Sequence, residues 1–186
     1  MTKPNMIVFM GGQGSGKGTF AHMLLTKHDF NYVEAGAILR QMPADSTIGK
    51  KVANGELIDD DNLFSIIAEH IKPNHDVILD GFPRTLNQAK WLINNYADKF
   101  NIQIIFLNIT EDKMIAHIKK RIYEGGNRKD DEDEAAVRKR IDAFKTNTIP
   151  AIQWLSNVDG IKFFDVRLSS DDICENFELI LHTLQK

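Results

Sequence analysis

The chain has 186 residues, 42% hydrophobic and 26% charged, which is enough to bury a substantial core and is typical of a globular protein. Its 23 basic and 26 acidic residues give a net charge of −3, which argues against general affinity for nucleic acid or an anionic membrane surface. The longest apolar runs, residues 6–10 and 104–107, are too short to span a bilayer, and no signal peptide is expected. The single cysteine, Cys174, excludes an internal disulfide and a cysteine zinc cluster, and is interpreted as a residue on a helix face. We therefore expect a cytoplasmic enzyme that partners neither nucleic acid nor membrane.

The predicted elements alternate between strands and helices along the chain. The apolar run at residues 6–10 is typical of a strand buried on both faces, and an apolar stripe predicts a helix over residues 17–27. Other strands are predicted at residues 32–33, 77–80, 102–109 and 161–166. Other helices are predicted at about residues 38–40, within 43–55, and at 62–71, 86–96, 111–123, 131–145, 149–156 and 169–184.

This alternation predicts an α/β fold of three layers, in which helices cover both faces of a five-stranded parallel sheet. We expect one domain over residues 1–186, with two excursions at residues 43–60 and 125–130. Ligands of such sheets bind beyond the carboxyl ends of the strands. The loops after residues 10, 33, 80 and 109 are therefore the expected place of a binding site.

The loop between the first strand and the first helix has the sequence of a phosphate-binding loop. Glycines at 11, 12, 14, 16 and 18 allow backbone N–H groups to surround an anion, and the helix beginning near Lys17 adds its positive dipole end. The lysine supplies a mobile ammonium for the β- and γ-phosphates. The motif predicts a P-loop NTPase fold and ATP binding at Gly12, Gly14, Ser15, Gly16, Lys17, Gly18 and Thr19.

Two motifs together resemble one family. Gly18 follows the lysine where most P-loops have Ser or Thr, and this G-x-x-G-x-G-K-G-T form resembles adenylate kinase and its nucleoside monophosphate kinase relatives. Residues 80–85, D-G-F-P-R-T, resemble the signature of that family. The resemblance implies that Asp80 orients Mg²⁺-bound water, while Gly81 and Arg84 bind the monophosphate. It also implies that Lys17 and Arg84 are catalytic.

The acceptor side resembles the family in part. Residues 35–40 are A-G-A-I-L-R where the family has T-G-D-x-L-R, so Gly36 and Arg40 are retained as expected acceptor-binding residues. Ala35 and Ala37 replace a hydroxyl and a carboxylate, and Glu34 is a neighbouring carboxylate. Residues 54–59 resemble the stretch whose backbone lines the acceptor base, which implies roles for Glu56, Leu57 and Ile58. Gln88 lies where the family has a glutamine for the adenine edge, so AMP is the favoured acceptor.

The remaining arginines resemble the set that borders the family's lid. Arg121 is implied to stack on the ATP base, and Arg128 and Arg140 to be catalytic residues that contact the transferred phosphoryl group. Arginine suits this task because its planar fork pairs with phosphate oxygens. The resemblance implies an acceptor-binding excursion at about residues 35–60 and a short lid at about 122–130, with no room for a zinc-binding insert.

The expected reaction is reversible in-line transfer from Mg²⁺-bound ATP to a monophosphate, ATP + AMP = 2 ADP, by a monomer. Mg²⁺ is the expected cofactor, and no zinc is expected. Three functions stay open: an AMP kinase, a UMP/CMP kinase or other small-molecule P-loop kinase, and a nucleotide-binding protein of low turnover. The six histidines show no metal-ligand or triad spacing and are interpreted as surface or packing residues: His22, His28, His70, His75, His117 and His182.

Overall fold

The computed structural model, which describes residues 2–53, 58–125 and 134–185, contains one all-parallel sheet of five strands. The strands lie in the order β2-β3-β1-β4-β5. Their bounds are β1 Asn5–Met10, β2 Asn31–Glu34, β3 Val77–Asp80, β4 Asn101–Asn108 and β5 Lys162–Arg167. This order places β1 at the centre, and the connection after β1 leads to the β2 edge whereas the connection after β3 leads to β4 on the other side. The order confirms the predicted α/β class with a five-stranded parallel sheet.

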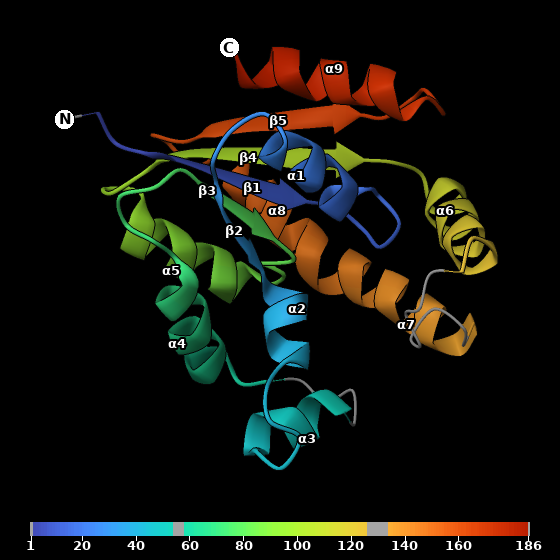
Figure 1. Cartoon of the computed structure of the whole chain (residues 1–186), viewed down its shortest axis with the longest axis horizontal. Coiled ribbons are helices and arrows are strands. Elements are labelled where there is room, and N and C mark those ends of the chain that lie inside the picture. Colours follow the sequence, from blue (N-terminus) through green and yellow to red (C-terminus); the bar gives the residue numbers. More distant parts are fainter. Residues whose placement is uncertain (1, 54–57, 126–133, 186) are drawn as a thin grey trace.

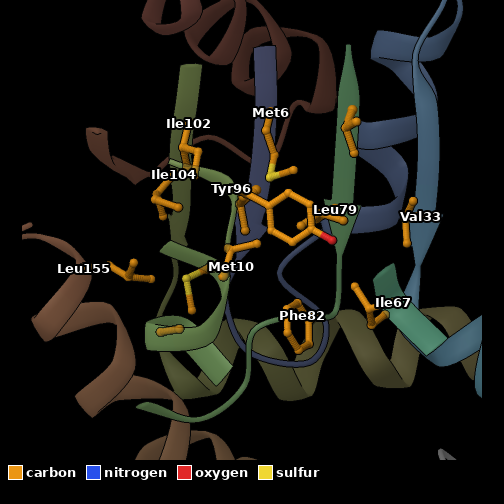
Figure 2. Packing of buried hydrophobic residues seen from close by; sticks show 14 of the residues in the cluster. Met6, Met10, Val33, Ile67, Leu79, Phe82, Tyr96, Ile102, Ile104 and Leu155 are labelled. Carbon is orange, nitrogen blue, oxygen red and sulfur yellow. The ribbon is translucent and has the colours of Figure 1, made fainter. Parts of the chain in front are cut away.

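Side chains of the central strand alternate between two hydrophobic clusters, because successive residues of a strand point to opposite faces. Met6, Val8 and Met10 belong to one cluster, which also holds buried residues of α4 (Asp60–His70), α5 (Leu86–Tyr96) and α8 (Ile149–Leu155) (Figure 2). Ile7 and Phe9 belong to the other, with residues of α1 (Lys17–Leu25) and α9 (Ile173–Leu184). Both faces of the sheet are therefore covered, which is why β1 is apolar throughout rather than alternating.

The helices follow the predicted order, and side chains cap the starts of several of them. They are α1 Lys17–Leu25, α2 Ala35–Arg40, α3 Thr47–Ala53, α4 Asp60–His70, α5 Leu86–Tyr96, α6 Glu111–Tyr123, α7 Glu134–Ala143, α8 Ile149–Leu155 and α9 Ile173–Leu184. The predicted start of the last helix was four residues early, because Asp172 accepts from the backbone N–H of Cys174 and caps α9 there. Cys174 is exposed near the start of this helix.

A π-helical turn, Phe144–Thr148, joins α7 directly to α8. The sequence predicted two separate helices here. Pro150, in the first turn of α8, cannot donate the N–H that an α-helical hydrogen bond to residue 146 would need, and the π-helical turn lies at this point. Such turns widen the helix locally and often lie at functional sites.

The site-forming loops lie at the carboxyl edge of the sheet. The P-loop follows β1, α2 follows β2 without an intervening loop, and residues 81–85 follow β3. Figure 1 shows α6 beyond the arrowhead of β4, close to α7. In the same view α2 and α3 lie below β2, whereas α9 lies above β5. Within the described ranges, no helix is long and apolar enough to cross a membrane.

Candidate phosphate-transfer site

The P-loop adopts a conformation that only glycine fits at two of its positions. Gly14 and Gly16 have φ values of 80° and 88°, in the left-handed region that side chains disfavour. A Cβ on Gly14 would also lie 2.6 Å from the carbonyl oxygen of Met114 in α6. Gly16 is the N-cap of α1, so the P-loop ends there and the helix begins at Lys17. The predicted strand–glycine loop–helix arrangement is thus present.

The ammonium of Lys17 lies inside the curve of this loop. Its Nζ donates to the carbonyl oxygens of Gly11 and Gly12, at 2.8 Å each, and lies 3.4 Å from Ser15 Oγ. Ser15 is only 2% exposed, so this end of the loop is tightly packed. The cation is therefore held over the cradle by groups of the loop itself.

Asp80 ends β3 and faces the first turn of α1. The residue is 7% exposed, and a Cβ on Gly18 would lie 3.4 Å from its Oδ2. Burial raises the pKa of Asp80 above its ordinary value, and the positive charge of Lys17 opposes this rise. A Cβ at position 18 would be in ordinary van der Waals contact with Oδ2 of Asp80, so the first turn of α1 packs directly beside the carboxylate.

Tyr32, which no sequence motif indicated, reaches the same carboxylate. Its hydroxyl donates to Asp80 Oδ2 at 3.1 Å and lies 3.5 Å from Oε2 of Glu34. Burial, followed by the two negative charges, raises the pKa of Tyr32 strongly, so the phenol stays protonated and acts as a donor. Glu34 in turn accepts from Arg40 at 3.0 Å. One polar chain therefore runs from Asp80 to an arginine expected to bind the acceptor phosphate.

Arg84 follows β3 after a turn that starts with Gly81, whose φ is 79°. Its Nε donates to the Gly81 carbonyl at 2.8 Å, so the guanidinium folds back over the turn. A Cβ on Gly81 would lie 3.2 Å from Arg84 Nη2 and 3.9 Å from the backbone nitrogen of Gly36. In α2, Arg40 Nη1 lies 3.0 Å from the position of a Cβ on Gly36. Gly36, Arg40, Gly81 and Arg84, four of the predicted acceptor residues, are thus neighbours.

Gln88 is only 7% exposed, and both ends of its amide are bound. Its Oε1 accepts from the backbone N–H of Arg84 at 2.8 Å, and its Nε2 donates to Oδ1 of Asp60 at 3.0 Å. Its own backbone N–H donates to Thr85, the N-cap of α5. The residue expected to read the base is therefore fixed by its neighbours.

The arginines near the lid lie on two packed helices. Ile118 of α6 packs with Val137 and Ile141 of α7, which brings the helix of Arg121 against that of Arg140. Arg138 pairs with Glu134 on an exposed face of α7, so it has a local partner. Three predicted site residues, Glu56, Leu57 and Arg128, lie outside the described residues. Ile58, which was predicted with Glu56 and Leu57 to line the acceptor base, is described and packs against the core.

Two more residues that sequence reasoning missed support the loops. Nδ1 of His117 on α6 lies 2.8 Å from the carbonyl oxygen of Gly14. This exposed histidine, which was interpreted as a surface or packing residue, therefore contacts the P-loop. It precedes Arg121 by one helical turn, which was the only available signal. Thr148, 8% exposed in the π-helical turn, donates its hydroxyl to the carbonyl of Arg84 at 2.9 Å.

The donor set suits a magnesium ion that is carried by a nucleotide. Mg²⁺ keeps several waters and takes one or two carboxylates together with substrate phosphates. Asp80 offers such a carboxylate beside the phosphate cradle, with Glu34 as its neighbour. Residues 2–53, 58–125 and 134–185 hold no group of three or more His, Cys, Asp or Glu able to enclose a metal. The chemistry therefore fits a water-mediated site on Asp80.

Comparison with known proteins agrees with these motifs. The family model described as adenylate kinase matches residues 9–159. A protein named adenylate kinase from Bacteroides thetaiotaomicron is 31% identical over 185 residues, covering 91% of this chain and 96% of the relative. One from Prochlorococcus marinus (strain MIT 9301) is 33% identical over 168 residues, covering 86% and 88%. One from Thermus thermophilus is 30% identical over 168 residues, covering 83% and 88%.

Proposed function

The chain belongs to the adenylate kinase family and is a nucleoside monophosphate kinase, and we propose that its phosphate acceptor is AMP. The reaction would be ATP + AMP = 2 ADP, by reversible in-line transfer without a phosphoenzyme. The observation that carries phosphoryl transfer to a monophosphate is the common location of Lys17, Asp80, Arg84 and Arg40 at the carboxyl edge of β1, β2 and β3. We further propose that the enzyme acts as a monomer in the cytoplasm.

The donor phosphates would bind in the P-loop. Backbone N–H groups of Gly12, Gly14, Ser15, Gly16, Gly18 and Thr19 supply neutral donors, and the start of α1 supplies its positive dipole end. Lys17 Nζ now lies against the carbonyl oxygens of Gly11 and Gly12, and phosphate oxygens would replace these partners. Phosphate is the better partner, because its negative charge makes each hydrogen bond charge-assisted.

The acceptor phosphate would bind between Arg84 and Arg40. The Arg40 guanidinium lies beside Gly36 in α2, and the Arg84 guanidinium lies beside Gly81 in the loop after β3. A Cβ on Gly81 would lie 3.9 Å from the backbone nitrogen of Gly36, so the two arginines flank one short stretch of backbone. An arginine fork pairs with two phosphate oxygens and so fixes direction as well as distance, which in-line transfer requires. Glu34 already holds Arg40 by an ion pair, which supports a preset orientation.

Asp80 would hold the water shell of Mg²⁺, and the ion would neutralise charge that develops on the transferred group. The chain's contribution is a carboxylate fixed at the end of β3 and oriented by the Tyr32 hydroxyl. Position 37 is alanine where the family has an aspartate, so Asp80 would hold the water shell without that second carboxylate. The hydrogen bond from the Tyr32 hydroxyl keeps Asp80 in one orientation for this task.

The choice of AMP rests on Gln88. A base edge that carries an amino group beside a ring nitrogen needs an acceptor beside a donor, and an amide offers both. Arg121, Arg128 and Arg140 are proposed to approach ATP and the transferred phosphoryl group as the lid and acceptor segments close. Closure would exclude water and so suppress hydrolysis of ATP.

Initial rates with ATP and a panel of AMP, UMP, CMP and GMP test the proposal. We expect kcat/KM for AMP to exceed that for each other acceptor by at least about a hundredfold, the discrimination available to a site that hydrogen-bonds its substrate. A preference for UMP or CMP would overturn the choice of acceptor. Tight ATP binding without turnover on any acceptor would indicate a nucleotide-binding protein instead.

A further inference from the structure

The amide of Gln88 is held in one of its two possible orientations. Asp60, in the first turn of α4, takes the amino end of the amide on Oδ1, and its Oδ2 accepts from Asn87 Nδ2. The backbone N–H of Arg84 takes the oxygen end. An ionised carboxylate only accepts and a backbone N–H only donates. Rotation of the amide by 180° would therefore place oxygen against carboxylate and N–H against N–H.

The orientation matters because a free glutamine amide cannot discriminate between base edges. In one orientation its oxygen and N–H complement an amino group beside an unprotonated ring nitrogen, and after a flip they complement a carbonyl beside a ring N–H. A site discriminates strongly only when the wrong ligand leaves its buried polar groups unpaired. The two internal bonds leave Gln88 one further N–H and one further oxygen lone pair for a ligand.

We propose that Asp60 is a specificity-determining positioning residue, which fixes the amide of Gln88 so that an adenine edge is accepted and a hypoxanthine edge is rejected. This inference rests on the proposed function. Asp60 contacts the base only through Gln88 in this account. Its role differs from capping, because Asp59 is the N-cap of α4 and accepts from the backbone N–H of Asn62.

The test compares AMP with IMP, which has nearly the same shape and exchanges donor for acceptor on the edge concerned. The variant Asp60→Asn keeps the size of the side chain, but its own amide can present either an oxygen or an amino group to Gln88. We expect the ratio of kcat/KM for AMP to that for IMP to fall about tenfold, mainly through improved use of IMP. KM for ATP should stay at its wild-type value.

Asp61→Asn is the matched control, because Asp61 is an exposed acid in the same helical turn. It should leave the AMP to IMP ratio unchanged. Asp60→Ser is a second variant, whose hydroxyl both donates and accepts and so also removes the orientation preference. It keeps the inference testable if Asp60→Asn does not fold.

Failure of the inference and failure of the proposed function give different results. Wild-type protein that does not phosphorylate AMP overturns the proposed function itself. Wild-type protein that uses AMP and IMP equally overturns the inference, and so does an unchanged ratio in a folded Asp60 variant. A loss of stability in that variant with an unchanged ratio would show that Asp60 is only a packing contact.

Discussion

The hydroxyl of Tyr32 lies 3.1 Å from Oδ2 of Asp80, across two neighbouring strands. The two residues are brought together by the parallel register of β2 and β3, in which Glu34 is opposite Asp80. Tyr32 stays protonated because burial and two carboxylates raise its pKa. Asp80, which we propose holds the water shell of Mg²⁺, therefore has a fixed hydrogen-bond donor in Tyr32. This contact matters because position 37, an aspartate in the family, is alanine in this chain.

Tyr32→Phe should weaken Mg²⁺ binding at this site, because it removes the hydrogen bond that orients Asp80 but leaves the carboxylate in place. Losing one hydrogen bond of about 1 kcal/mol should raise the Mg²⁺ concentration for half-maximal rate about fivefold at fixed ATP. Calorimetric titration of ATP with and without Mg²⁺ should show weaker binding only when Mg²⁺ is present. Tyr96→Phe, at the last residue of α5, is the control, because it also removes one tyrosine hydroxyl. An unchanged Mg²⁺ requirement in Tyr32→Phe would contradict a positioning role.

Asp80→Asn should stabilise the fold while it abolishes transfer. A carboxyl whose pKa is higher in the native than in the unfolded chain stabilises the protein below its unfolded-state pKa of 3.8 and loses this contribution as pH rises through the native value. Asparagine does not titrate. The variant's gain in Tm over wild type should therefore grow from about pH 4 towards pH 7, as measured by thermal unfolding. A gain that shrinks over this interval would contradict the raised pKa of Asp80.

The predictable parts of the fold and site were local. The P-loop and residues 80–85 could be found from sequence because each motif places its groups within one strand–loop–helix connection. Asp80, Lys17 and Arg84 then meet because parallel strands end at one edge of the sheet. The family followed from the same motifs and the α/β class from the alternation of predicted strands and helices, and both are confirmed, by the family match and by the strand order respectively.

The supporting residues could not be predicted, because their contacts connect distant segments. Tyr32 and Asp80 are 48 positions apart, Asp60 and Gln88 are 28, and Thr148 and Arg84 are 64. Their partners depend on strand order and helix packing, which no local pattern states. The π-helical turn before α8 was missed for a related reason, since the sequence alone favoured two separate helices.

Thr148→Val should weaken acceptor binding and spare the donor site. Valine keeps the volume of threonine but leaves the carbonyl of Arg84 without this donor. KM for AMP should rise about fivefold, as expected for one hydrogen bond of about 1 kcal/mol, with KM for ATP unchanged. Thr148→Ser should restore the wild-type value. If both KM values rise together, or if serine does not rescue, Thr148 has no specific effect on Arg84.

Lys17→Met should lower kcat by at least about a thousandfold, because the removed cation neutralises charge on the donor phosphates during transfer. Methionine keeps the unbranched apolar stem, so far-ultraviolet circular dichroism should match that of wild type. Lys27→Met, at an exposed lysine beyond the end of α1, should keep full activity. Wild-type rates in Lys17→Met would mean that the P-loop does not bind the transferred phosphate.

The most direct test of the central claim follows the transferred phosphate itself. Wild-type protein is incubated with Mg²⁺, AMP and ATP labelled at the γ-phosphorus, and labelled products are separated by chromatography. We predict that the label appears in the β-position of ADP and that two ADP form for each AMP consumed. Label released as inorganic phosphate at the same rate with and without AMP would contradict the account, and so would the absence of label from ADP when AMP is present.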